Sequence, residues 1–329
     1  ADYIIELFKF GFEKRLPQID DVIARTNHTK EEYEDRLKME YEVLTSVGLA
    51  DYFLIVNDVI RFAISDGQLL GAGRGSAAGS LILYLLGVTH VDPIEYDLLF
   101  ERFYNAGRNT ADHVSLPDVD MDFEKNGRER ILKYVRNKYG HDRVGQIITF
   151  NRMQGRGSLK DVNRAHDVLD EETINKITKL LPESEAEISD QLESRREEDK
   201  KNGGEGEASI IEWALDNYPK DFSEWAYYDN NGNLQGPLSK IFEQAIRMEG
   251  TKRGSSKHAA GLVISTEPMS EIVPMAYDPS TGEMIAALEM GDLEKRGQVK
   301  FDFLGIAALD KVHASINHLR TGVLSLYDE

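Results

Sequence analysis

The stretch Ser-Leu-Pro-Asp-Val-Asp-Met-Asp-Phe-Glu, residues 115–124, alternates carboxylate and apolar side chains. In a strand, successive side chains point to opposite faces, so Asp118, Asp120 and Asp122 would share one face while the apolar residues between them pack beneath. Aspartate is a poor strand former and neighbouring like charges repel, so the pattern destabilises the chain unless a cation compensates it. The stretch predicts a cation site or, as the alternative, the solvated face of an edge strand.

A second strand with a carboxylate is predicted at residues 298–305, where Asp302 lies between two phenylalanines and Lys300 precedes it by two positions. Two strands that present carboxylates on one sheet face would form the oxygen-rich pocket that Mg²⁺ prefers. Such a pocket can hold two ions, which clamp the attacking and leaving oxygens of a phosphoryl displacement. Lys300 would share this face, where it could offset the carboxylates in an ion pair or contact a phosphate.

A glycine-rich turn, Gly-Ala-Gly-Arg-Gly-Ser at residues 71–76, leads into the apolar segment 77–88. We expect a helix to start near Ser76, so that the amides freed by the glycines, the helix N-terminus and Arg74 would suit an anion such as phosphate. A nucleotide-binding P-loop is excluded because Gly-Lys-Ser/Thr is absent. The dinucleotide fingerprint fits only loosely, through Gly73, Gly75 and Ala78. A purely structural turn is the alternative.

The net charge of -19 argues at first sight against a nucleic-acid partner, because proteins that bind polyanions usually carry a basic surface. The charge is segregated, however. Acidic residues concentrate at 182–209, whereas 127–143 and 247–258 are locally basic. The overall sign therefore says little about any one face.

Several classes of site are excluded by composition. The chain has no cysteine, which rules out disulfides, thiolate zinc sites and cysteine nucleophiles, and its histidines lack metal-ligand spacing. No apolar run approaches the ~20 residues of a membrane span, and the N-terminal segment lacks the pattern of a signal peptide. We expect a cytoplasmic protein without a membrane partner.

The order of predicted elements indicates one α/β domain interrupted by a helical subdomain. Apolar residues recur at helical spacing from 1 to 48, and Thr29 is a plausible helix start. Helices alternate with short strands at 67–72, 114–123 and 144–150. Residues 155–238 show no convincing strand, and strands return at 258–265, 284–289 and 298–305, before a helix.

Two other features have structural interpretations. A lone histidine before an apolar strand, such as His258, is more often a hydrogen-bonded structural residue than a ligand. Trp213 and Trp225 are expected in the core of the helical subdomain.

Five motifs together resemble the catalytic core of bacterial replicative DNA polymerase III alpha subunits, the C family of DNA polymerases. The resemblance covers nearly the whole chain, and the motifs come in the family's order. They lie at residues 69–103, 115–124, 130–153, 257–265 and 299–305.

The resemblance implies an α/β (α+β) fold, with a nucleotidyltransferase palm of the DNA polymerase beta type whose mixed sheet has flanking helices and is interrupted by a helical thumb. It implies linking helices at 1–47, palm at 48–154, thumb at 155–250 and palm again at 251–329. The catalytic and metal-binding carboxylates would be Asp120, Asp122 and Asp302, with Asp118 in a supporting role. They would hold two Mg²⁺ ions, for which Mn²⁺ could substitute.

The implied reaction is template-directed DNA synthesis from deoxynucleoside triphosphates on a primer–template. The residues implied to bind the incoming nucleotide are Gly73, Arg74, Gly75, Ser76 and Lys300. Those implied to contact DNA are Lys252, Arg253 and Lys257, for which solvated surface is the alternative.

The family's PHP, fingers, clamp-binding and OB regions have no counterpart in these residues, so we expect little or no primer extension by this chain alone. A sliding clamp and other replisome subunits would bind through those regions. The family often has an arginine before the Ser-x-Pro-Asp motif, where this chain has Arg108 and His113. The competing functions are a primer–template-binding or split polymerase subunit that is inactive alone, and a small nucleotidyltransferase with a non-nucleic-acid substrate.

Overall fold

The structure is a computed structural model that describes residues 2–105, 107, 117–201, 203, 208–278 and 281–321. Arg108 and His113, the candidates for the arginine expected before the aspartate motif, lie outside these residues, as do Ser115 and Leu116 of the motif itself.

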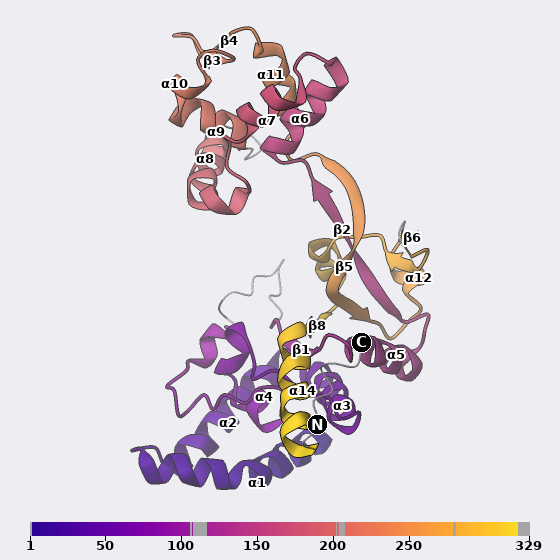
Figure 1. Ribbon diagram of the computed structural model, residues 1–329. Helices are drawn as coiled ribbons and strands as arrows, with labels where there is room; N and C mark the ends of the chain where they lie inside the picture. Colours follow the sequence, from indigo (N-terminus) through magenta and orange to yellow (C-terminus); the bar gives the residue numbers. More distant parts are fainter. Residues whose placement is uncertain are drawn as a thin grey trace. The chain divides into compact units, whose positions relative to one another are not determined.

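The described chain forms helices, short 3-10 turns and eight strands, which Figure 1 labels. The helices are α1 (Asp2–Arg25), α2 (Lys30–Ser46), α3 (Ala50–Ser65), α4 (Leu81–Leu85), α5 (Arg128–Tyr139), α6 (Gly155–His166), α7 (Glu171–Thr178), α8 (Ser189–Lys201), α9 (Ile210–Asn217), α10 (Pro219–Phe222), α11 (Ser239–Met248), α12 (Met269–Ile272), α13 (Met290–Lys295) and α14 (Ala307–Thr321). The 3-10 turns are η1 (Gly75–Gly79), η2 (Phe100–Arg102) and η4 (Glu185–Ile188). The strands are β1 (Asp120–Glu124), β2 (Val144–Arg152), β3 (Tyr227–Tyr228), β4 (Leu234–Gln235), β5 (Lys252–Ile264), β6 (Met275–Tyr277), β7 (Met284–Ala286) and β8 (Lys300–Ile306).

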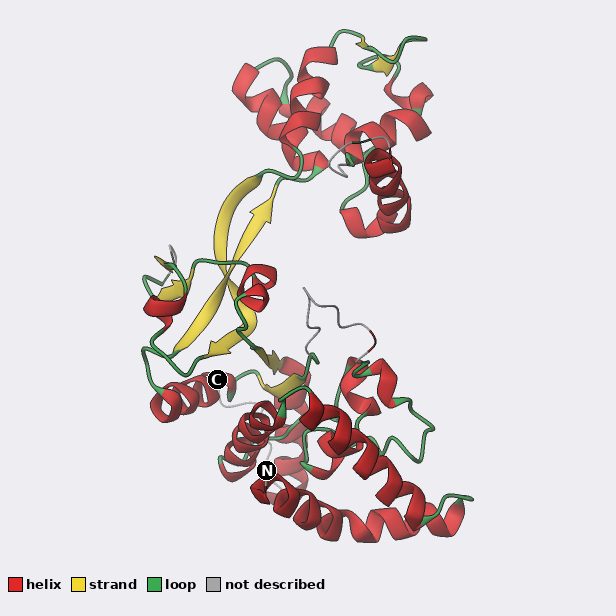
Figure 2. Ribbon diagram, turned by 180° about the vertical axis from the view of Figure 1, so that it is seen from behind, coloured by secondary structure: helices red, strands yellow, loops and turns green. Residues whose placement is uncertain are grey.

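Six strands form one mixed sheet in the order β1-β8-β5-β2-β7-β6. β1 is parallel to β8, and β2 is parallel to β7, whereas β5 runs antiparallel to β8 and β6 antiparallel to β7. The predicted fold class, a mixed sheet with flanking helices, is confirmed (Figure 2).

The chain divides into two compact units. The first unit comprises Ala1–Thr149 and Lys257–Glu329, and the second comprises Phe150–Ser256. The first unit has the aspartate motifs and the glycine-rich turn, and the second contains α6 to α11 with the short strands β3 and β4.

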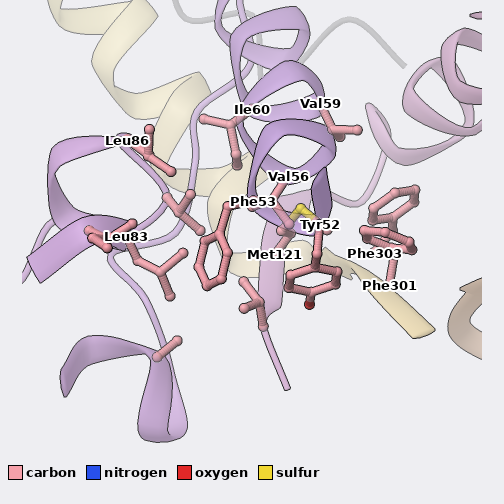
Figure 3. Packing of buried hydrophobic residues seen from close by; sticks show 14 of the residues in the cluster. Tyr52, Phe53, Val56, Val59, Ile60, Leu83, Leu86, Met121, Phe301 and Phe303 are labelled. Atoms are coloured by element: carbon pink, nitrogen blue, oxygen red, sulfur yellow. The ribbon is translucent and has the colours of Figure 1, made fainter. Parts of the chain in front are cut away.

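The core of the first unit lies between α3 and the two strands that present the aspartates. Figure 3 shows Tyr52 and Phe53 of α3 together with Met121 of β1 and Phe301 of β8. The rings of Tyr52 and Phe301 stack with centroids 4.9 Å apart. The apolar residues between the aspartates are fully buried, as the alternating pattern predicted. This packing fixes which face of β1 and β8 presents carboxylates.

The second unit has its own hydrophobic core, to which all of its helices, α6 to α11, contribute. Trp213 is buried in this core, and Trp225 is partly buried and packs against the core, as predicted. The sequence did not predict the short antiparallel hairpin that β3 and β4 form here, in a region expected to lack strands, nor β6 of the first unit. Strands of two residues are too short to show an alternating pattern.

The largest differences from the predicted elements surround the glycine-rich turn. Residues 67–72 are not a strand, and the helix expected near Ser76 is the 3-10 turn η1 followed by α4, which starts at Leu81. Gly73 and Gly75 adopt φ angles of 108° and 57°, which are incompatible with a regular strand or an α-helix.

Among the described residues, no single helix is long and apolar enough to cross a membrane. Helices α2 and α3 satisfy the length and composition criteria only as a pair bent by 115°.

Candidate active site

Three carboxylates come together at the start of β1 and β8. The parallel register aligns Asp120 with Asp302, and Asp118 lies just before β1. One oxygen from each of these aspartates lies within 4.8 Å of the others. This spacing lets the three oxygens bind one cation, which is the arrangement that hard divalent ions prefer.

Asp302 is the member of this cluster that most needs a positive partner. It is only 6% exposed, and burial raises the pKa of its carboxyl, although the charge of Lys300 opposes that shift. Among the described residues its Oδ1 atom has no hydrogen-bond partner. A buried, unpaired carboxylate oxygen is unfavourable, so the donor set fits a divalent cation.

Lys300 lies inside the cluster. Its Nζ atom is 2.7 Å from Oδ2 of Asp302 and 3.6 Å from Oδ1 of Asp118. Burial lowers the pKa of Lys300, but the hydrogen bond to Asp302 and the two negative charges outweigh burial and raise that pKa overall. The ion pair considered for this lysine is therefore present.

Asp122 does not belong to the cluster, although it shares the strand face of Asp120. Its carboxylate accepts one bifurcated hydrogen bond from Nε of Arg74, which lies 2.9 Å from Oδ1 and 3.0 Å from Oδ2. Asp122 is 8% exposed, and burial raises its pKa while Arg74 opposes the shift. The structure thus brings Asp118 to Asp120 and Asp302, and pairs Asp122 with Arg74. The role of Asp122 as a metal ligand stays a prediction.

The glycine-rich turn lies directly beside β1. Gly71 donates its backbone N–H to the carbonyl oxygen of Asp122 at 3.0 Å, and a Cβ at Gly71 would lie 2.5 Å from Cβ of Asp122. Only glycine permits this approach. The turn thereby places the side chain of Arg74, which is 47% exposed, with its Nη2 atom 3.9 Å from Oδ2 of Asp120.

The amides at the start of α4 are not available to an external anion, contrary to expectation. The buried carboxylate of Glu40 accepts hydrogen bonds from three donors: Oγ of Ser80 at 2.8 Å, the backbone N–H of Leu81 at 2.9 Å and that of Ile82 at 3.1 Å. An internal carboxylate therefore caps this helix. Binding of a phosphate by Arg74 and the turn before η1 stays a prediction.

Arg36 completes this arrangement. Its Nε donates to Oε1 of Glu40 at 2.7 Å, and its Nη2 donates to the carbonyl oxygens of Gly79 and Leu98 at 2.7 and 3.0 Å. Neither Glu40 nor Arg36 was predicted to belong to the site. Their spacing of four residues on a helix was the available signal, but that spacing is common on solvated helix faces.

The three basic residues predicted to contact DNA all have protein partners. The ammonium of Lys252 lies 3.8 Å from the centroid of the Phe150 ring. Arg253 lies 3.0 Å from a carboxylate oxygen of Asp161, and Lys257 lies 3.0 Å from one of Glu283. Contact of Lys252, Arg253 and Lys257 with DNA stays a prediction.

His258 has the structural role expected for it. Its Nδ1 atom accepts hydrogen bonds from the backbone N–H of Gly261 at 2.6 Å and of Ala260 at 3.2 Å. These bonds fix the backbone at the point where β5 begins to be buried.

Fold and site together define a class. A mixed sheet flanked by helices, with aspartates on adjacent strands beside a glycine-rich turn, is a nucleotidyltransferase-like palm. Residues 2–305 match the family described as "Bacterial DNA polymerase III alpha NTPase domain", and the chain belongs to this family.

Its relatives include the DNA polymerase III subunit alpha of Aquifex aeolicus, 39% identical over 94% of this chain and 25% of that protein. The DNA polymerase III subunits alpha of Staphylococcus epidermidis RP62A and Staphylococcus aureus NCTC 8325 are 37% and 36% identical, over 86% and 88% of the chain. These matches cover 23% and 24% of those two proteins. The chain therefore spans about a quarter of the length of these relatives.

Proposed function

We propose that this chain contains the catalytic palm of a template-directed DNA polymerase, which transfers a nucleotidyl group from a deoxynucleoside triphosphate to a primer 3′-hydroxyl. One observation carries the proposal: Asp118, Asp120 and Asp302 converge from adjacent strands, and a buried oxygen of Asp302 has no partner among the described residues. Membership in the polymerase III alpha family supports the same reaction.

The residues that would hold metal are Asp120 and Asp302, with Asp118 within reach of both and Asp122 two positions further along the same strand face. Two Mg²⁺ ions, or Mn²⁺ in their place, would neutralise charge on the attacking and leaving oxygens of the phosphoryl transfer. The protein supplies position and charge without a nucleophilic side chain of its own.

The triphosphate would lie along the turn of Gly73, Arg74, Gly75 and Ser76. Arg74 is half exposed, and its planar guanidinium can bind phosphate oxygens through two donors at once. Lys300, on the neighbouring strand, offers a second cation. Asp122 is bound by the Nε donor of Arg74, so the Nη donors of the same guanidinium could contact phosphate.

We assign the unit with the sheet and carboxylates as the palm, with the N-terminal helices packed on it, and Phe150–Ser256 as the thumb. The basic residues Lys252, Arg253 and Lys257 would contact the backbone of a primer–template after exchanging their carboxylate or aromatic partners for phosphate. A sliding clamp and other replisome subunits would bind elsewhere in a longer protein.

The test is Mn²⁺ binding measured by isothermal titration calorimetry on the wild type and on Asp120→Asn, Asp302→Asn and Asp292→Asn. Asp292 is an exposed carboxylate paired with Lys295, so its variant is the matched control. We expect both cluster variants to lose at least about tenfold in affinity, about 1.4 kcal/mol, and the control to lose nothing. Equal affinity in all four proteins would refute the metal site.

A gel shift with primer–template DNA at low and high salt separates the remaining functions. A polymerase palm or a primer–template-binding subunit should bind with an affinity that falls as salt rises. A nucleotidyltransferase with a small-molecule substrate should show no such shift.

A further inference from the structure

The carboxylate cluster already contains a cation that belongs to the protein. The ammonium of Lys300 contacts both Asp302 and Asp118, at 2.7 and 3.6 Å. The nearby Asp122 is neutralised by Arg74. Four carboxylates on one face thus meet two side-chain cations, and a net negative charge remains.

The Lys300–Asp302 ion pair leaves a carboxylate oxygen of the cluster without a partner in the described part of the chain, unlike an ion pair with a purely structural role. One oxygen of Asp302 has no partner among the described residues, although Asp302 is more than nine-tenths buried. Asp120, which aligns with Asp302 across the strands, forms no ion pair with this ammonium among the described residues. A single monovalent ammonium therefore leaves part of the cluster uncompensated.

Lysine is suited to a temporary role at such a place. Its charge is a compact ammonium on a flexible four-carbon stem, so it can leave one anion and reach another without moving the backbone. The side chain of Lys300 is 21% exposed, which leaves it a route toward solvent. The backbone at Lys300 is held in β8 by its pairing with Val263 of β5.

We propose that Lys300 is a stand-in for the divalent cation: its ammonium occupies the carboxylate cluster until metal binds, then leaves it and contacts the triphosphate of the incoming nucleotide. This inference rests on the proposed function, because it takes the cluster as a metal site. It adds a coupling between metal and nucleotide. Lysine displaced by metal is free for phosphate, and, since linkage is reciprocal, phosphate that holds Lys300 favours metal binding.

The first test follows the chemical reactivity of Lys300 in the wild-type chain. An ammonium in an ion pair reacts slowly with an amine-acylating reagent, because only the neutral amine is a nucleophile. Labelling, quantified by mass spectrometry at pH 8, should rise at least threefold at Lys300 on addition of Mg²⁺, and fall again when dTTP is added with Mg²⁺. The control is Lys295, which is 75% exposed and outside the cluster, and should label equally in all three states.

Labelling of Lys300 that stays constant or falls on addition of Mg²⁺ would refute the displacement. A rise with Mg²⁺ that dTTP does not reverse would refute the transfer of Lys300 to phosphate.

The second test uses the variant Lys300→Met, which keeps an unbranched side chain and removes the charge. Its Mn²⁺ affinity in calorimetry without nucleotide, at pH 8, should be about tenfold tighter than that of the wild type, because no internal cation competes. The matched control Lys295→Met should bind Mn²⁺ as the wild type does.

The outcomes distinguish the two proposals. Equal or weaker Mn²⁺ binding by Lys300→Met, with binding by the wild type intact, would refute only the stand-in role. If neither protein binds Mn²⁺ while both remain folded by circular dichroism, the metal site itself is refuted, and the proposed function with it.

Discussion

Replacement of Glu40 by glutamine tests how the buried carboxylate of Glu40 holds the start of α4, which follows the glycine-rich turn. Glu40 is completely buried in α2, yet its carboxylate serves Ser80, Leu81 and Ile82 at the start of α4. These residues follow the turn that presents Arg74. The substitution keeps the shape of the side chain and one acceptor oxygen, while it removes the negative charge.

The magnitude follows from the groups left without partners. Arg36, whose side chain is 15% exposed, would lose the only carboxylate within 4 Å of it among the described residues. Breaking one side of a buried pair typically costs ~3–5 kcal/mol, and each backbone donor left unsatisfied costs ~1–3 kcal/mol. Because the glutamine oxygen retains part of these bonds, we expect Glu40→Gln to destabilise the first unit by ~3 kcal/mol. For a unit of this size that lowers the Tm by roughly 6–12 °C.

The assay can report on the two units separately. The chain has two tryptophans, Trp213 and Trp225, and both lie in the unit Phe150–Ser256. Tryptophan emission therefore follows unfolding of the second unit, and far-ultraviolet circular dichroism follows both. We expect Glu40→Gln to lower the temperature of a dichroism transition and to leave the tryptophan transition within about 1 °C of the wild type.

A double-mutant cycle with Arg36→Met isolates the pair. The combined variant should be ~1–3 kcal/mol less destabilised than the sum of the single variants, because removal of both charges leaves neither one buried alone. A cost of Glu40→Gln below ~1 kcal/mol, or strictly additive single variants, would refute the argument that this pair holds α4 in place.

Two further predictions concern stability. Burial raises the pKa of Glu249 from 4.5 to about 7, so the folded state binds this proton more tightly than the unfolded state does. The second unit should therefore lose at most ~3 kcal/mol of stability as pH rises from about 4.5 to about 7. Melting followed by tryptophan emission at pH 5 and pH 8 measures how the stability of the second unit depends on pH. The variant Glu249→Gln should reduce this dependence. A rise of stability with pH would contradict the raised pKa of Glu249. Gly71→Ala should lower the free energy of unfolding by ~1–3 kcal/mol, because the new Cβ would clash with Asp122. Gly157→Ala in α6, where a Cβ meets nothing within 4 Å, should raise the free energy of unfolding by up to ~1 kcal/mol. Urea unfolding measures both, and a neutral Gly71→Ala would show that the turn can move away from β1.

Much of the fold could be predicted because its signals are local. Thr29 begins α2 with the expected cap, in which its hydroxyl accepts from the backbone N–H of Glu32 while the Glu32 side chain accepts from Thr29. The strands expected at 144–150, 258–265 and 298–305 are present as β2, β5 and β8, although β5 begins six residues earlier than predicted, at Lys252. Alternation at 118–123 correctly placed Val119, Met121 and Phe123 in the core, but Asp122 on the opposite face is buried as well, where it pairs with Arg74.

The errors arose where distant segments decide local structure. Residues 67–72 are apolar enough for a strand, but Gly71 makes a single hydrogen bond to β1 before positive φ angles turn the chain away. An anion site was predicted at the start of the helix after the glycines. In the structure the carboxylate of Glu40, about 40 residues earlier in the chain, accepts the hydrogen bonds of the amides at the start of α4. Periodicity within a segment contains no information about such a partner.

The sequence by itself determined the family, the mixed α/β fold and the face on which the aspartates lie, because strand alternation and motif order are properties of the chain. Only the tertiary structure decided how the charged groups pair. The parallel register of β1 and β8 places Asp120 beside Asp302 and leaves Asp122 to Arg74, and it puts the ammonium of Lys300 among the carboxylates. Electrostatic partners are set by distances of a few ångströms between segments nearly two hundred residues apart, and those distances exist only once the sheet has formed.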